Sequence, residues 1–279
     1  MSSSKAQANL PRHLICLKKH RKPLITAEGK EVALWQIQLP NDESLLSGWA
    51  KSFREHYCLD SEIDALRAGT GLSRKDYLTT IVFPDKSIAP GPAVRAGDFA
   101  EILVSDYLEY LLDYWVPREK YAEKATRNES VKGVDILGFF LAHPQKPSPK
   151  DRLIAFESKA QLTGSRYLNC LQEAVNHSSK DLLRRAYSLN ATKRRLLAAG
   201  RPQKALIVQR FQDLADNPYM FRSGAAAVLC DTAFDQKTIA KSTTVSAHNN
   251  KANLELLVIR GKDLISLVHA LYERAANEA

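Results

Sequence analysis

The stretches VKGVDILGFF (residues 131–140) and RLIAFESKA (residues 152–160) carry the information that decides the fold. Both are apolar runs of strand length, and the proline-rich segment HPQKPSPKD between them predicts a turn. Because side chains alternate across a strand, Glu157 and Lys159 are predicted to share a face with Ala155. Two opposite charges then end an otherwise apolar strand, where burial is costly unless they are paired or bind a metal.

Asp135 lies in the first of these strands. If the two strands pair as a hairpin, Asp135 and Glu157 lie opposite each other, and two adjacent carboxylates disfavour joint ionisation. A divalent cation would relieve that repulsion, and oxygen ligands favour Mg²⁺ or Mn²⁺. The ion would polarise a phosphodiester and acidify a water molecule. Lys159 would then orient or help deprotonate that water, or stabilise the charge that develops on phosphorus.

Similar triplets occur elsewhere in the chain, so the E-x-K spacing alone is weak evidence. Glu-Gly-Lys stands at residues 28–30 and Asp-Gln-Lys at residues 235–237, and neither has an apolar strand around it. The competing interpretation of Glu157 and Lys159 is a surface ion pair near a strand end.

The chain of 279 residues, with 44% apolar and 25% charged residues, is long enough for one large core. The Pro/Gly stretch at residues 87–97 suggests a boundary, so we expect an N-terminal α+β subdomain at 1–90 and a catalytic core at 91–279. The alternation of apolar segments predicts an α/β fold with a mixed central sheet flanked by helices.

The element predictions rest on hydrophobic periodicity and on helix-capping residues. Ser61 and Ser73 are the expected N-caps of two helices, and Asp98 is expected in a first turn. Strands are predicted at 13–24, 31–40, 131–142, 152–162, 204–211, 225–234 and 253–261. Helices are predicted at 45–57, 61–69, 73–83, 97–115, 165–199 and 263–277.

Glu101, in the helix predicted at 97–115, borders the polar stripe of that helix, a position equally suited to a metal ligand and to solvent. His177 is expected to make a polar contact rather than to act in catalysis. A basic segment further on could grip phosphates or be a solvated helix face. Its candidate nucleic-acid-binding residues are Lys180, Arg184, Arg185, Lys193, Arg194 and Arg195.

The net charge of +9 favours a polyanionic partner such as DNA, although many basic proteins have none. The four cysteines form no C-x-x-C pair, so buried reduced thiols are expected. No apolar run is long enough for a membrane span, and the first residues lack the apolar stretch of a signal peptide. We therefore expect a cytoplasmic protein with no membrane partner.

The order of acidic helix, G-x-D strand, E-x-K strand and helix resembles the PD-(D/E)XK nuclease superfamily. Within it, the K-G-x-D and E-S-K motifs are most similar to the HamA-type effectors of the Hachiman antiphage defence system, over roughly residues 90–200. The resemblance implies a restriction-endonuclease-like core and assigns Glu101, Asp135 and Glu157 as acids of the metal site and Lys159 as the catalytic lysine. Val134 replaces the proline of the superfamily's name.

The same resemblance implies a DNA-cleaving effector that a helicase partner restrains. The large aromatic residues Trp35, Trp49 and Phe53 are considered as interface anchors, although burial in the core is the favoured interpretation for each. Two other functions stay open: a stand-alone restriction or repair nuclease, and a catalytically dead nucleic-acid-binding subunit. An intact set of Asp135, Glu157 and Lys159 argues against the last.

Overall fold

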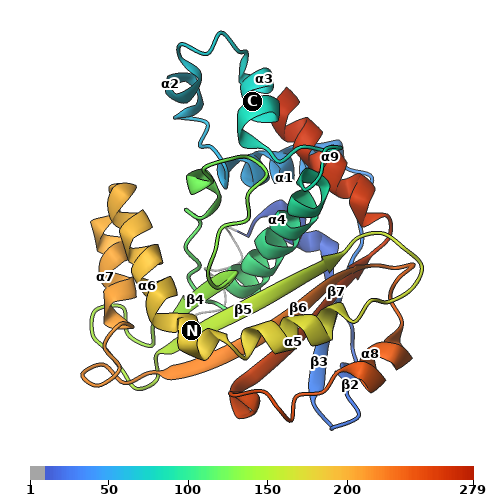
Figure 1. Cartoon of the computed structure of the whole chain (residues 1–279), viewed down its shortest axis with the longest axis vertical. Helices are drawn as coiled ribbons and strands as arrows, with labels where there is room; N and C mark the ends of the chain where they lie inside the picture. Colours follow the sequence, from blue (N-terminus) through green and yellow to red (C-terminus); the bar gives the residue numbers. More distant parts are fainter. Residues whose placement is uncertain (1–9) are drawn as a thin grey trace.

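The computed structural model describes residues 10–279, in which a mixed sheet has helices on both faces (Figure 1). The sequence predicts a frayed tail at residues 1–12, and residues 1–9 of it lie outside the described range. The strand order is β1-β3-β7-β6-β5-β4, and β2 also pairs with β3. The strands are β1 (Leu17–Lys19), β2 (Leu24–Ile25), β3 (Glu31–Ile37), β4 (Ile136–Phe140), β5 (Arg152–Gln161), β6 (Met220–Cys230) and β7 (Leu254–Gly261).

The central strands β5, β6, β7 and β3 pair in parallel, whereas β4 and β1 are antiparallel to their neighbours. This mixed sheet confirms the predicted α/β class. The α-helices of the described chain are α1 (Glu43–Glu55), α2 (Ile63–Arg67), α3 (Arg74–Tyr77), α4 (Gly91–Asp106), α5 (Cys170–Ser178), α6 (Asp181–Ala198), α7 (Pro202–Arg210), α8 (Gln236–Ser242) and α9 (Leu264–Asn277).

The described chain also contains short 3-10 and π turns. The 3-10 turns are Arg12–Cys16, Tyr121–Glu123 and Lys251–Asn253, and the π turns are Leu78–Val82 and Tyr107–Leu111.

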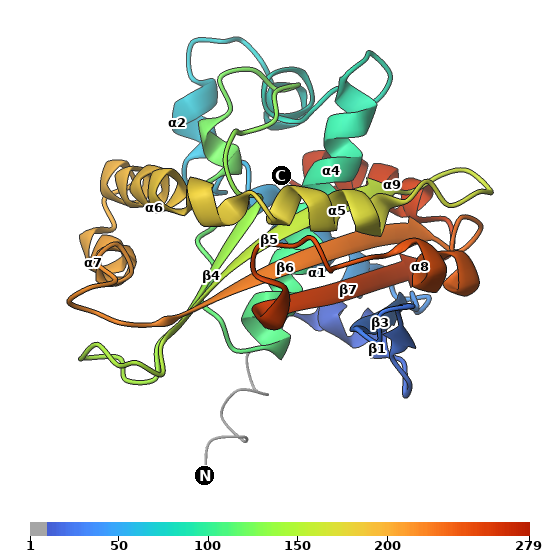
Figure 2. The same ribbon diagram turned by 60° about the horizontal axis from the view of Figure 1, so that its bottom comes forward.

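The two faces of the sheet have separate cores, as the alternation of side chains requires. Ile154 and Phe156 of β5 pack on one face with α1, α4 and α9. Leu153 and Ala155 of β5 pack on the other face with α6 and α7. On that second face, α5 covers β5 and β6 (Figure 2). The predicted division of the two faces of residues 152–160 is confirmed.

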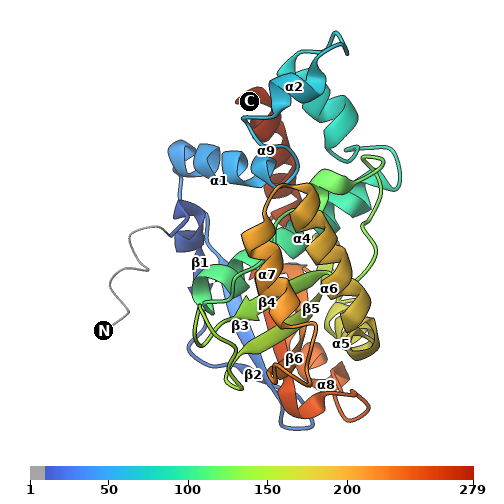
Figure 3. The same ribbon diagram turned by 90° about the vertical axis from the view of Figure 1, so that its left-hand side faces the viewer.

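The strand predicted at 204–211 is wrong, because this segment is helix α7. Pro202 stands at the first turn of the helix, where it needs no amide hydrogen. Ala205, Val208 and Phe211 recur every three residues and are buried, while Leu206 is exposed. Alternation would have placed Leu206 and Val208 on one face, so only the helical spacing fits. Figure 3 shows α7 beside α6.

Three further helix predictions need correction. The stretch 165–199 is two helices, α5 and α6, separated at Ser179 and Lys180. Ser61 caps no helix, because α2 begins after Glu62, which makes no capping bond. Asp98 lies in the middle of α4, since that helix starts at Gly91, and its carboxylate accepts a hydrogen bond from Tyr57. The Ser73 cap is confirmed, because its Oγ accepts from the amide of Asp76.

The boundary predicted at residue 90 crosses one sheet and one core. β3, from the first segment, pairs in parallel with β7, and α1 packs on α9. Trp49 and Phe53 are buried in that core, and Trp35 is partly buried against Tyr107. Trp49 and Phe53 therefore pack inside the molecule, whereas Trp35 keeps part of its side chain at the surface.

The four cysteines are free and buried, as predicted. Within residues 10–279, none of the helices combines the length and apolar character that a membrane span requires.

Candidate functional site

Asp135 and Glu157 are brought together by the pairing of β4 with β5. The antiparallel register matches Ile136 with Phe156, so the residues just beyond, Asp135 and Glu157, stand opposite each other. The predicted hairpin is thereby confirmed. Asp135 Oδ2 also accepts a hydrogen bond of 3.0 Å from the amide of Ser158. Gly133 has a φ of 120°, which a side chain would disfavour, so the K-G-x-D spacing requires glycine there.

Glu157 is buried in the middle of β5, directly after the apolar run 153–156, and is only 3% exposed. Its Oε1 has no hydrogen-bond partner within the described chain, and its Oε2 lies 3.9 Å from Lys159 Nζ. Burial, together with the charges of Asp135 and Asp181, raises the pKa of Glu157 to about 9. The pair is thus a buried acid beside a partly exposed ammonium.

Asp181 is a third acid of the site and is fully buried, and the sequence analysis did not select it. It opens α6, where the helix dipole favours an acid, and neither carboxylate oxygen has a hydrogen-bond partner in the described residues. Burial and the charge of Asp135 raise the pKa of Asp181 to about 7. The sequence feature that could have identified Asp181 is its isolation, because it is the one acid between Lys180 and Lys204.

The break between α5 and α6 places two more groups over Glu157. His177 Nδ1, at the end of α5, lies 3.8 Å from Glu157 Oε2. Burial and the nearby Lys159 and Lys180 lower the pKa of His177. Arg184 Nη1, one turn into α6, lies 4.0 Å from both Glu157 Oε1 and Asp181 Oδ1. A single continuous helix over this region would lack the turn that lets both helices point at Glu157.

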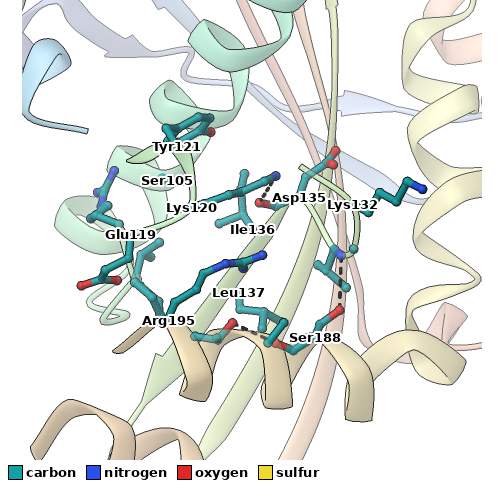
Figure 4. A pocket seen from close by; sticks show the side chains of 17 residues that line it. Ser105, Glu119, Lys120, Tyr121, Lys132, Asp135, Ile136, Leu137, Ser188 and Arg195 are labelled. Atoms are coloured by element: carbon teal, nitrogen blue, oxygen red, sulfur yellow. Dashed lines mark hydrogen bonds between the residues drawn. The ribbon is translucent and has the colours of Figure 1, made fainter. Parts of the chain in front are cut away.

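Glu101 approaches from α4, which covers the opposite face of the sheet. Its Oε2 accepts hydrogen bonds of 2.7 Å from Lys120 Nζ and 2.9 Å from the Tyr121 hydroxyl. Lys120 also donates to the backbone carbonyl of Asp135 at 3.0 Å (Figure 4). It therefore joins Glu101 to the site. Burial raises the pKa of Glu101 to about 7, with Asp135 adding to the effect. Lys120 is a further residue of the site, and no sequence motif identified it beforehand.

The six predicted nucleic-acid-binding residues do not share one surface. Arg185 lies over the ring of Phe221, at 5.2 Å from its centroid, and Lys193 donates to Gln209. Arg195 pairs with Glu123 at 2.7 Å. Of the other three, Lys180 precedes α6 and Arg184 Nη1 lies 4.0 Å from Glu157 Oε1, whereas Arg194 lines a hollow further along the helix together with Arg195.

The two competing triplets have structural roles. Glu28 accepts a hydrogen bond from the amide of Val245, and Asp235 caps α8 by accepting from the amides of Lys237 and Thr238. Neither acid lies in an apolar strand beside another acid.

The carboxylate oxygens of the site are ligands that suit a hard cation, although the acids do not form a complete coordination shell. Within residues 10–279, no three His, Cys, Asp or Glu side chains converge closely enough to hold an ion. Mg²⁺ commonly binds through one or two carboxylates and keeps several waters, so it does not require such a cage. The unpartnered buried oxygens of Glu157 and Asp181 are what a cation would neutralise. The residues present therefore fit Mg²⁺ or Mn²⁺.

Together, fold and site define an α/β protein whose mixed sheet carries buried acids beside a lysine. A family model described as HamA matches residues 12–275. The chain belongs to the HamA family, which is part of the Hachiman antiphage defence system. No curated protein matches the chain.

Proposed function

We propose that this defence protein is a metal-dependent deoxyribonuclease of PD-(D/E)XK type, with Asp135, Glu157, Lys159 and Glu101 in its active site. The observation that carries the proposal is the pairing of Asp135 with Glu157 opposite it, and of Glu157 with Lys159 beside it. Structural carboxylates are usually satisfied by hydrogen bonds, whereas Glu157 Oε1 has no partner in the described chain. A buried acid with a strongly raised pKa is typical of a functional site.

The proposed reaction is hydrolysis of a phosphodiester. Water forms a new bond to phosphorus, and one ester P–O bond breaks to leave a phosphate and a hydroxyl. Asp135 and Glu157 would hold Mg²⁺ or Mn²⁺, and the ion supplies Lewis-acid polarisation of the phosphate when bound. Lys159, about a quarter exposed, would stabilise the negative charge that develops on the phosphate oxygens or hold the attacking water.

Purified protein incubated with supercoiled and linear DNA tests this function, with Mg²⁺ in one arm and EDTA in the other. We expect cleavage only with the metal. Glu157→Gln and Lys159→Ala should each reduce the rate by about two or more orders of magnitude, because the first impairs a metal ligand and the second removes the group that stabilises the phosphate charge or holds the water.

Lys30→Ala is the matched control, because it removes the lysine of the other E-x-K triplet, whose ammonium donates to a backbone carbonyl. It should leave cleavage unchanged. Wild-type cleavage by Lys159→Ala would refute the assignment. DNA binding without any cleavage, alone or with a helicase, would favour a catalytically dead subunit, and cleavage of RNA alone would change the substrate class.

We also propose that a helicase encoded beside the nuclease restrains it. The support is membership in a defence family, together with the hazard that a complete and unregulated nuclease site presents to host DNA. A restriction or repair nuclease working alone is the alternative, and a neighbouring methyltransferase gene rather than a helicase gene would favour it.

A further inference from the structure

One face of α6 combines cations with an exposed aromatic ring. A helix turns by about 100° per residue, so residues spaced by three or four share a face. Lys180, Arg184, Tyr187, Ala191 and Arg194 follow that spacing. Arg185 and Lys193 fall on other sides of the helix, where they contact Phe221 and Gln209. Helical geometry therefore places Lys180, Arg184, Ala191 and Arg194 on one face with Tyr187, which we call the stripe. Arg185 and Lys193 lie on other faces.

Four residues of the stripe, Arg184, Tyr187, Ala191 and Arg194, line a series of adjoining hollows that reaches Asp135. A hollow at Asp135 shares Lys132, Gly133, Ser188 and Ala191 with a larger hollow of about 530 Å³, which Arg184 and Tyr187 also line. Figure 4 labels Lys132, Asp135 and Ser188 around the first of these hollows. Ala191 also lines a third hollow, with Arg194 and Arg195. We name this surface the α6 groove, defined by Lys132, Arg184, Tyr187, Ser188, Ala191 and Arg194.

Tyr187 has no structural reason to lie on this surface. Its side chain is 81% exposed, and among the described residues no hydrogen bond or ring contact involves it. Its neighbour Leu183 is 78% exposed. Lys132, Lys180 and Arg194 likewise form no ion pair within residues 10–279, so their charges are available to an anion.

We propose that the α6 groove binds a single strand of nucleic acid, with an unpaired base stacked on Tyr187 and the backbone phosphates beside Lys132, Lys180 and Arg194. The proposal rests on the nuclease function and adds its substrate class, an unpaired strand or a frayed end. Aromatic side chains and cations in one groove are how proteins bind single strands without reading sequence. In a duplex the bases stack on one another and are not free to cover Tyr187. The strand would run along the groove toward Asp135, which lines the adjoining hollow.

Fluorescence anisotropy of the full chain in EDTA tests the inference without requiring cleavage. The probes are a labelled oligo-dT strand and a labelled duplex. Tyr187→Ala should bind the single strand on the order of tenfold to a hundredfold more weakly, which is the usual effect of losing one base stack. Tyr187→Phe keeps the ring and should bind as the wild type does. The duplex should be bound with little change by all three proteins.

Leu206→Ala is the matched control, because it removes an exposed apolar side chain of α7 outside the groove. It should bind the strand normally. Unchanged strand affinity of Tyr187→Ala, an equal loss on the duplex, or no strand binding by the wild type would each overturn the inference. Loss of a partner protein with unchanged strand affinity would also overturn it and assign Tyr187 to a protein interface. Tyr187-dependent binding without cleavage under any condition would refute the nuclease function alone.

Discussion

Burial and two neighbouring acids disfavour the charged form of Glu157. It is buried, it faces Asp135 across the hairpin, and Asp181 lies close by. Lys159 and Arg184 oppose this effect only at 3.9 and 4.0 Å. Keeping the Glu157 carboxyl in these surroundings lowers the stability of the folded protein. Such a loss of stability is common where function requires the group.

The raised pKa of Glu157 has a consequence for stability in the metal-free protein. The unfolded chain loses this proton near the ordinary pKa of 4.5, whereas the folded chain keeps it up to about 9. Between those values the folded state binds more protons, so the free energy of unfolding falls as pH rises. In EDTA, Glu157→Gln should therefore gain stability over the wild type between about pH 5 and about pH 8.

Thermal melts of both proteins across this range measure the difference. Added Mg²⁺ should raise the melting temperature of the wild type at the higher pH and have less effect on Glu157→Gln, because a ligand stabilises only the state that binds it. A stability difference between the two proteins that stays constant with pH would contradict the burial of an ionisable acid at this position.

At the scale of elements, the break between α5 and α6 is what completes the site. His177 ends the first helix, Asp181 begins the second, and both point toward the same carboxylate of β5. The orientation of α6 then decides which of its cations can reach a strand bound near Asp135. Hydrophobic spacing predicts helix on both sides of the break but does not mark where the chain turns.

Salt dependence distinguishes the two sides of α6. Each phosphate contact that a protein makes on a single strand adds about 0.7 to the slope of log affinity against log salt. Lys180→Ala should reduce that slope by about this amount, because Lys180 belongs to the stripe. Lys193→Ala should leave the slope unchanged, since its ammonium contacts Gln209. Equal slopes for the two variants in an anisotropy titration would contradict this division of the helix.

At the scale of the whole molecule, residues 10–90 are built into the same sheet and core as the rest of the described chain. β3 extends the sheet beyond β7, and α1 packs on α9 close to the C-terminus (Figure 1). The predicted division at residue 90 stays a prediction about folding units. An interface with a partner must use exposed side chains, such as Ile81 and Ile88, rather than the buried Trp49 and Phe53.

The proposed restraint predicts a stable complex between this chain and a helicase. A specific interface of this kind should bury more than about 1,000 Å². Cleavage by the complex should require ATP hydrolysis, because the helicase must move before the nuclease reaches DNA. Co-purification followed by cleavage assays with ATP or a non-hydrolysable analogue measures this. Equal cleavage by free and complexed protein, without a nucleotide effect, would favour a stand-alone nuclease.

The α/β class, the β4–β5 hairpin and the opposition of Asp135 and Glu157 could all be predicted from the amino-acid sequence. These depend on alternation and short-range pairing, which a local pattern records. Only the tertiary structure decided that 204–211 is a helix, because an apolar segment of eight residues fits either period until its packing is known. It also brought Asp181, Lys120 and Tyr187 toward the site or its groove. Their positions depend on where α5 ends and how α6 is oriented, and such long-range contacts leave no local spacing in the chain.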